Sequence, residues 1–128
     1  MSGVIDISKL RTPPEQHEFE AAKYFSDLGY DIEFIPPSNI PNVHIPDIKM
    51  DGVEWEIKSP QGKGKHTIEH NIANALLQSF YIIVDLSRIG LSESDCIKRL
   101  NKEYENRKQI RRLYIITKSK ELIMLKRK

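Results

Sequence analysis

The chain lacks several features that mark other classes of protein. It holds one cysteine, Cys96, so no internal disulfide can form, which fits a reducing compartment or a protein that does not depend on oxidation. It has no run of about 18 apolar residues and no uninterrupted apolar segment near its first residue. No internal repeat or low-complexity tract is present. We therefore expect no signal peptide, no membrane span and no repeat architecture.

What is present is typical of a soluble globular protein. The 128 residues are 39% hydrophobic and 30% charged, and a chain of this length can bury one hydrophobic core. We predict a single domain over residues 1–128, in which residues 1–14 form a flexible arm. The net charge of +2 permits a nucleic-acid partner but does not demand one.

The order of apolar patterns predicts an α/β fold with a mixed central sheet flanked by helices. A 3.6-residue period indicates helices, whereas alternating or continuous short apolar runs indicate strands. The expected helices are residues 15–28, 67–80 with Thr67 as N-cap, and a third that begins after Ser92 and ends near 107–112. The expected strands are residues 30–36, two strands of a hairpin within 45–58, and 81–86, 113–117 and 122–126.

The segment PDIKMDGVEWEIK, residues 46–58, predicts a tight β-hairpin. Asp51 and Gly52 are the residue pair that a type I′ turn favours, because both central positions need positive φ. Counting outward from this turn places Asp47 opposite Glu56. One face of the hairpin is then apolar and the other is charged. The charged face holds Asp47, Lys49, Glu54, Glu56 and Lys58.

Two carboxylates that face each other across a hairpin repel, so Asp47 and Glu56 need compensation. One of them can keep its proton, or a cation can lie between them. Lys58 is a cation on the same face, and Mg²⁺ is a second candidate because it prefers oxygen ligands. The alternative interpretation is a solvated strand face with ordinary surface ion pairs.

Two basic segments are candidates for contacts with nucleic acid. The loop SPQGKGKHT, residues 59–67, carries Lys63, Lys65 and His66, which can follow a phosphodiester backbone, although such a loop can also be only mobile and solvated. Arg111 and Arg112 belong to a second group of cations at the end of the third helix, where positive charge also has a structural role.

The hairpin and its neighbours resemble a known nuclease family. Pro46, Asp47 and the run Glu56-Ile57-Lys58 resemble the PD-(D/E)XK nuclease signature, and a glutamate within HEFEAA matches the αβββαβ order of that superfamily. The stretches HEFEAAKYFSDLGYDIEFIP, PDIKMDGVEWEIKSPQG and ANALLQSFYIIVDLS resemble the C-terminal toxin domains of contact-dependent inhibition, of the CdiA type, many of which are tRNA nucleases.

The resemblance implies a restriction-endonuclease-like αβββαβ core, followed by a C-terminal helix and hairpin. It implies Mg²⁺ or Mn²⁺ bound by Asp47 and Glu56, with Lys58 orienting or activating water. Glu18 best fits the acid on the first helix, with Glu15 and Glu20 as rivals, and Gln78 stands where several of these enzymes place a helix glutamine. A cognate immunity protein would then cover the acidic cleft. The site of action would be cytoplasmic, after delivery as part of a secreted toxin.

Other functions fit the same residues. A metal-independent ribonuclease would use His66 or His70 as general base, because imidazole titrates near neutral pH. A DNA-cleaving nuclease of the same fold is a second alternative. A non-catalytic module that binds nucleic acid or a protein partner is a third, and it predicts binding without turnover.

Overall fold

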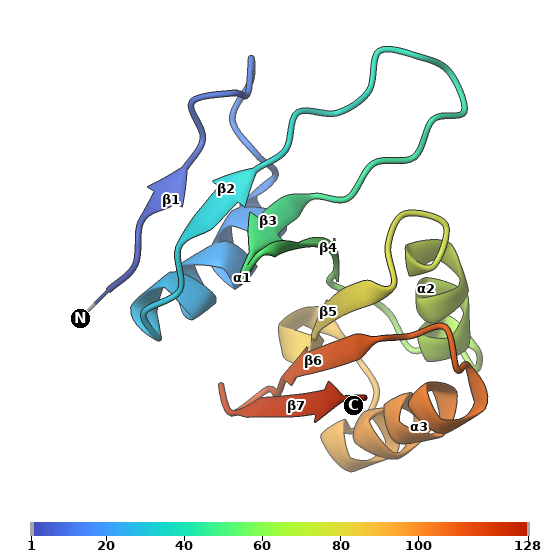
Figure 1. Cartoon of the computed structure of the whole chain (residues 1–128). Coiled ribbons are helices and arrows are strands. Elements are labelled where there is room, and N and C mark those ends of the chain that lie inside the picture. The colour runs from blue at the N-terminus through green and yellow to red at the C-terminus, as the bar shows by residue number, and fades with distance from the viewer. Residues whose placement is uncertain (1, 128) are drawn as a thin grey trace.

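A computed structural model describes residues 2–127 and shows a seven-stranded sheet with helices on both faces (Figure 1). The strands follow one another across the sheet in chain order. They are β1 (Ile5–Asp6), β2 (Ile32–Phe34), β3 (Ile48–Met50), β4 (Val53–Lys58), β5 (Tyr81–Asp85), β6 (Arg112–Ile116) and β7 (Leu122–Lys126). The helices are α1 (Gln16–Asp27), α2 (Thr67–Ala75) and α3 (Glu93–Asn106), and the 3-10 turn η1 (Leu86–Arg88) follows β5.

The sheet is mixed, as predicted for an α/β protein. Strand β1 is parallel to β2, and β4, β5 and β6 are parallel to one another. The pairs β2–β3, β3–β4 and β6–β7 are antiparallel. From α1 onward the elements follow the predicted αβββαβ order, after which come α3 and the closing hairpin.

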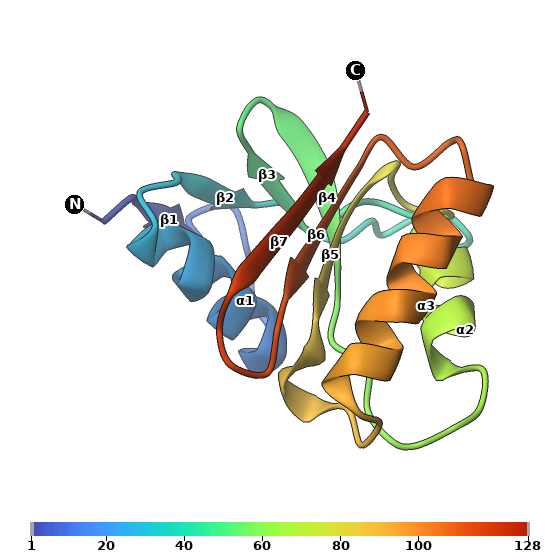
Figure 2. The same cartoon turned by 90° about the horizontal axis from the view of Figure 1, so that it is seen from below.

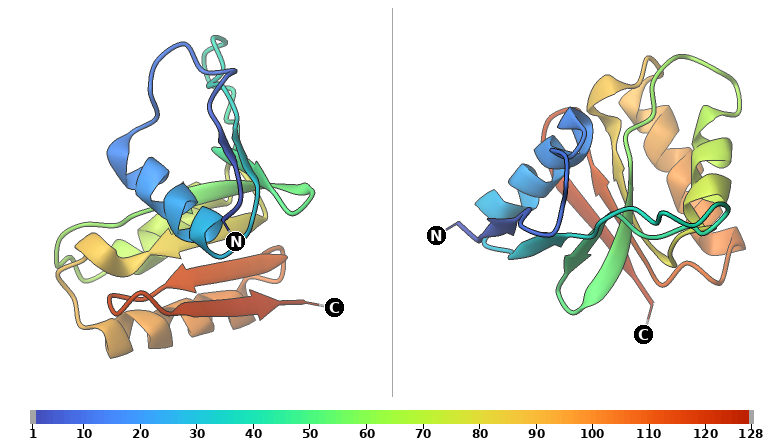
Figure 3. Two further views of the ribbon diagram at one scale, coloured as in Figure 1. Left: turned by 90° about the vertical axis from the view of Figure 1, so that its left-hand side faces the viewer. Right: turned by 90° about the horizontal axis from the view of Figure 1, so that it is seen from above.

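The helices cover opposite faces of this sheet, which Figures 2 and 3 show edge-on. Helix α1 packs Phe25 against Trp55 and Tyr114 in one buried cluster, whereas α2 and α3 pack on the other face. Strand β5 supplies Ile83 to the first cluster and Ile82 and Val84 to the second. It is therefore buried on both sides, as its continuous apolar run predicts. No helix within residues 2–127 is long and apolar enough to cross a membrane.

The predicted hairpin is confirmed. Asp51 and Gly52 have φ values of 56° and 77°, as a type I′ turn requires, and the described ladder pairs Met50 with Val53 and Ile48 with Trp55. The indole Nε1 of Trp55 donates to the carbonyl oxygen of Met50 at 2.9 Å. This bond ties the core tryptophan to the backbone at the turn and fixes the register of the hairpin.

Residues 3–6 differ from the predicted flexible arm. Val4 accepts a hydrogen bond from Ile32 N at 2.8 Å, and Gly3 N donates to Ser26 O at 2.7 Å. A Cβ at Gly3 would lie 1.9 Å from Tyr30 O, so only glycine fits this close approach. The segment forms strand β1, which is too short to give a periodic signal in the sequence.

The second helix is shorter than predicted. It ends at Ala75, and His66, not Thr67, is the N-cap residue. Leu77 N and Gln78 N donate to the carbonyls three residues earlier, Asn74 O and Ala75 O, so the last turn tightens and the chain leaves the helix. Ser79 then bonds β4 through its Oγ, 2.7 Å from Glu54 O. Gln78 consequently lies in the connection between α2 and β5, not on the helix.

Candidate active site

The candidate site lies where β4 changes its partner strand. Residues 53–55 of β4 pair with β3, and residues 56–58 pair with β5. The ladder with β3 ends at the pair Ile48–Trp55, so the predicted ladder pair of Asp47 with Glu56 does not form. The two strands separate there, and the Ile57 N–H, which points toward β3, needs another acceptor.

Asp47 supplies this acceptor with its side chain. Its Oδ2 accepts the hydrogen bond from Ile57 N at 2.8 Å, while its own backbone N–H donates to Trp55 O at 2.9 Å. The carboxylate thereby takes the place of a backbone carbonyl at the point where the strands separate. This arrangement draws Asp47 toward Glu56, so the two acids meet even though they are not a ladder pair.

Glu56 is buried with a strongly perturbed carboxyl group. Only 5% of the residue is exposed, and burial, the charge of Asp47 and a hydrogen bond shared with Asp47 raise its pKa to about 8. Lys58 lies 3.4 Å from Oε2 and acts in the opposite direction. Burial also raises the pKa of Asp47, against the Ile57 N–H and the charge of Lys58. Glu56 Oε1 has no hydrogen-bond partner in the part of the chain that the structure describes.

Helix α1 adds a third carboxyl group to this cluster. Burial, followed by the charges of Asp47 and Glu15, raises the pKa of Glu18 to about 7, and Lys58 opposes this shift. Glu20 is exposed and accepts a hydrogen bond from Gln16 Nε2 at 3.0 Å, whereas the side chain of Glu15 is largely exposed. Of the three rival glutamates, Glu18 is therefore the one with a partly buried carboxyl whose pKa the charge of Asp47 raises.

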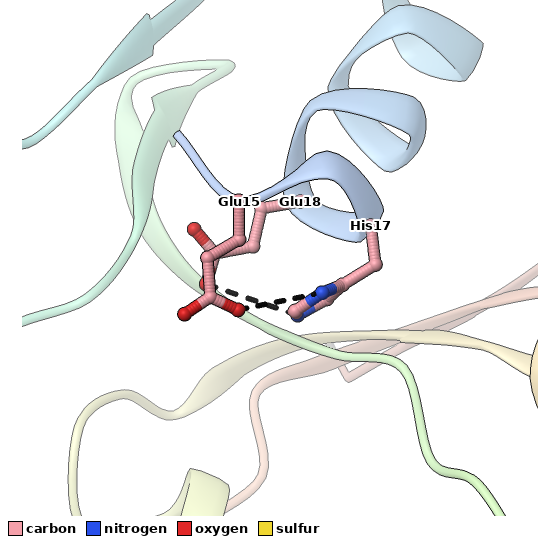
Figure 4. A group of neighbouring side chains, drawn as sticks. All are labelled: Glu15, His17 and Glu18. Atoms are coloured by element: carbon pink, nitrogen blue, oxygen red, sulfur yellow. Dashed lines mark ion pairs between the residues drawn. The ribbon is translucent and has the colours of Figure 1, made fainter. Parts of the chain in front are cut away.

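His17 joins the cluster, which the sequence analysis did not anticipate. Its Nδ1 lies 3.5 Å from Glu15 Oε2 and its Nε2 lies 4.0 Å from Glu18 Oε2. Figure 4 shows the imidazole pointing toward the two carboxylates. One ligand atom from each of Glu15, His17 and Glu18 lies within 4.8 Å of the others, a spacing that can hold a metal ion. The signal in the sequence was the Glu-x-His-Glu run at the start of the predicted helix.

The acidic groups face a hollow of about 280 Å³. Glu15, Glu18 and Asp47 line it together with Leu10, Phe34 and four prolines, Pro13, Pro14, Pro37 and Pro46. Carboxylate oxygens are suitable ligands for Mg²⁺ and Mn²⁺, and an imidazole suits softer transition metals such as Zn²⁺ or Fe²⁺. Glu56 Oε1 is buried without a hydrogen-bond partner among the described residues, and burial, followed by the charge of Asp47, raises the pKa values of Glu56 and Glu18.

The basic loop after β4 is partly anchored. Arg88 donates to Ser59 through Nε at 3.0 Å and through Nη2 at 2.8 Å, and Gly90 N donates to Gly62 O at 2.7 Å. Beyond this anchor, Lys63, Lys65 and His66 are exposed. The loop therefore presents its cations to solvent from a fixed base next to Lys58.

Two other groups of predicted site residues lie apart from this loop. Arg112 pairs with Asp51 at 3.0 Å, at the hairpin turn, and Arg111 precedes it and is exposed. These arginines and the loop lysines thus lie at opposite ends of β4. Gln78 lines a separate pocket with Pro46 and Glu54, and none of its described contacts places its amide against Asp47 or Glu56.

Comparisons with known proteins give the family. Residues 45–122 match the model of the family described as the contact-dependent growth inhibition CdiA C-terminal domain. The fold is similar to that of a solved chain from Burkholderia pseudomallei, described as a CdiA-CT/CdiI toxin and immunity complex, with a TM-score of 0.70 and 19% sequence identity. The match covers 98% of this chain and 100% of that one. No curated protein matches. The family model spans more than half of the residues of this chain, which therefore belongs to the CdiA C-terminal toxin domains of contact-dependent growth inhibition.

Proposed function

We propose that this toxin domain is a divalent-metal-dependent nuclease of PD-(D/E)XK type that hydrolyses phosphodiester bonds in RNA. The observation that carries the proposal is the buried Glu56 carboxyl, with one oxygen unpartnered among the described residues, beside Asp47 and 3.4 Å from Lys58. A purely structural carboxyl at this burial would have its hydrogen bonds satisfied. The resemblance of the sequence to tRNA-cleaving toxins favours tRNA as substrate.

Asp47 and Glu56 are the residues that would hold the cation, and Glu18 and His17 on α1, which interact electrostatically with Asp47, would complete or tune the ligand set. A bound Mg²⁺ or Mn²⁺ supplies an activated water and charge stabilisation at the scissile phosphate. Asp47 also has a structural role, because its carboxylate accepts a hydrogen bond from Ile57 N and thereby holds the backbone of β4. The ligand geometry is thus built into the sheet, not into a mobile loop.

Lys58 acts on the substrate from the same face. Its ammonium group lies next to the acid pair, where it can hold a phosphate oxygen and stabilise the charge that develops on it. The exposed Lys63, Lys65 and His66 follow Lys58 along the chain, so they can contact the backbone of the same nucleic acid. Arg111 and Arg112, near the opposite end of β4 from the loop lysines, would contact another part of the substrate backbone.

Cleavage of tRNA by the purified domain with and without EDTA tests the proposal. We expect cleavage to stop on chelation and to return with Mg²⁺ or Mn²⁺, and Glu56→Gln to lose it while the exposed control Glu105→Gln keeps it. Full cleavage in EDTA would contradict the proposal and direct attention to His66 and His70. Cleavage of DNA alone would contradict the substrate, and binding without any cleavage would indicate a non-catalytic module.

We also propose a cognate immunity protein as partner and the cytoplasm of the target cell as the site of action. The similar solved chain comes from a toxin and immunity complex, which supports a partner of this kind. Poor growth on expressing the domain, relieved by Asp47→Ala, would support an internal target. Normal growth with soluble, metal-loaded wild-type protein present in the cells would contradict it.

A further inference from the structure

A second pocket lies between the hairpin and the connection from α2 to β5. It has a volume of about 420 Å³, and its lining includes Pro46, Glu54, Leu77, Gln78, Phe80 and Tyr81. Pro46 also lines the hollow that contains Glu18 and Asp47, so the two spaces meet at this residue. The pocket therefore adjoins the proposed active site at Pro46.

The rim of this pocket is apolar and exposed. Leu77 is 63% exposed and Phe80 is 50% exposed, although large apolar side chains are normally buried. An aromatic ring that projects beside a nucleic-acid site is suited to stack on a base. Ser79 fixes the position of this rim, because its Oγ bonds Glu54 O at 2.7 Å and accepts from Tyr81 N at 3.0 Å.

Two polar side chains of the pocket can accept hydrogen bonds. Glu54 is exposed and contributes a carboxylate, whereas Gln78 Oε1 is buried without a hydrogen-bond partner among residues 2–127, so a ligand reaches it only when the Gln78 side chain turns toward the pocket. A ligand that satisfies both must offer N–H donors. Exocyclic amino groups of cytosine, adenine and guanine do so, whereas uracil presents carbonyl oxygens at the corresponding edge.

Positive charge lies at the far side of the pocket. Arg111 N donates to Phe80 O at 2.8 Å, and the guanidinium of Arg112 lies 5.9 Å from the ring centroid of Tyr81. A strand that enters from the acid cluster and places one base in the pocket would carry its next phosphates toward these arginines. The arginines therefore provide positive charge for the phosphates that follow the base in the pocket.

We propose that this pocket binds an amino-bearing nucleobase of the substrate, next to the bond that is cut. Phe80 stacks on the base, Glu54 and Gln78 accept hydrogen bonds from its amino edge, and Arg111 contacts the flanking phosphate. The proposal rests on the proposed nuclease function, and it gives Gln78 a role in substrate selection instead of the catalytic role suggested by the sequence.

Two single-stranded RNA oligomers of equal length, oligo(C) and oligo(U), test this inference. Cytosine and uracil differ at the edge in question but have the same size. We expect the wild-type domain to cleave oligo(C) about tenfold or more faster than oligo(U), the size of one good base contact. Glu54→Gln and Gln78→Ala should reduce this ratio toward one. Phe80→Ala should weaken binding of oligo(C) about tenfold, and Leu28→Ala, an exposed leucine on the far end of α1, should not.

Binding measured on an Asp47→Ala background separates this inference from the proposed function. Fluorescence anisotropy of labelled oligo(C) and oligo(U) reports the pocket without turnover. A preference for oligo(C) that Glu54→Gln removes would support the pocket even if the wild-type protein cleaves nothing, an outcome that would refute only the nuclease. Equal binding of both oligomers, unchanged in Glu54→Gln and Gln78→Ala, would overturn the inference even if cleavage is observed, and would leave the exposed rim as a contact for a protein partner.

Discussion

The backbone N–H of Ile57 donates to Oδ2 of Asp47 at 2.8 Å, so one carboxylate both closes the gap between two strands and lines the candidate site. In an ordinary antiparallel ladder this N–H would bond a backbone carbonyl of the neighbouring strand. Because β4 pairs with β5 instead of β3 from residue 56 onward, the side chain of Asp47 accepts this hydrogen bond in place of a β3 carbonyl. The stability of the fold and the proposed metal binding would therefore be coupled at Asp47, and substitutions can separate them.

Asp47→Asn and Asp47→Ala should affect stability differently. Asparagine keeps an oxygen that can accept from Ile57 N and removes the repulsion with Glu56, so the metal-free variant should be at least as stable as the wild type. Alanine leaves the N–H without an acceptor, which should lower the free energy of unfolding by about 1–3 kcal/mol. Urea denaturation in EDTA measures the free energy of unfolding of both variants. Both variants should also lose cleavage of RNA. Equal stability of the two variants would show that the bond to Ile57 contributes nothing.

The raised pKa values of Glu56, about 8, and Glu18, about 7, predict a stability that depends on pH. Both carboxyls stay protonated in the folded protein at pH values where the unfolded chain has released these protons, since the ordinary glutamate pKa is 4.5. The folded state then binds more protons, so the stability of the metal-free protein should fall as the pH rises from about 5 to 8.

Thermal unfolding at several pH values measures this effect. Glu56→Gln should flatten the decline in Tm relative to wild type, the exposed control Glu105→Gln should not, and Mg²⁺ or Mn²⁺ should restore stability most at pH 8, where its ligands are ionised. A wild-type Tm that rises over this range in EDTA, with the same slope in Glu56→Gln, would contradict the assignment of these pKa shifts.

Lys58→Met should separate metal binding from catalysis. The ammonium group lies 3.4 Å from Glu56 Oε2 and lowers the pKa of that carboxyl, so its loss weakens metal binding near pH 7 by favouring the protonated acid. At pH 9, where a larger fraction of Glu56 is ionised, the Mn²⁺ affinity of the variant should come closer to that of the wild type. Cleavage should still be about 10²- to 10³-fold slower, the effect of removing one group that stabilises transition-state charge. Wild-type cleavage by Lys58→Met at pH 9 would remove Lys58 from the mechanism.

Most of the fold could be predicted from local patterns in the sequence. The Asp51-Gly52 turn fixed the hairpin register, and the apolar run from Tyr81 indicated the strand buried on both faces. Strand β1 escaped prediction because two residues show no period. The end of α2 was misplaced because the apolar stripe continues to Ser79, whose hydroxyl bonds β4 in place of continuing the helix.

The site was less accessible to sequence reasoning because it depends on how β4 exchanges partners. Alternation places Asp47 and Glu56 on one face, but it cannot show that the ladder with β3 stops at Ile48. His17 was missed because its proximity to Glu15 and Glu18 depends on the geometry of the first helical turn. The family resemblance placed Gln78 on the second helix, whereas the tightened end of α2 leaves it in the connection to β5, where it lines the neighbouring pocket.

The anchored loop, residues 59–67, should hold the substrate through its exposed lysines. Arg88 fixes the loop at Ser59, and Lys63 and Lys65 are exposed beyond this point, so each can neutralise one phosphate without first ordering the whole loop. Neutralised phosphates release counterions, and for single strands each contributes about 0.7 to the slope of log affinity against log salt.

Replacing both Lys63 and Lys65 by glutamine should therefore reduce the magnitude of that slope by about 1.4 in an Asp47→Ala background. Lys102→Gln, an exposed lysine on α3, is the matched control and should leave the slope unchanged. The double variant should still prefer oligo(C) to oligo(U), because phosphate contacts do not distinguish bases. A slope equal to that of the control would mean that the loop lysines only face solvent, and that the bound strand runs instead from the acid cluster toward Arg111.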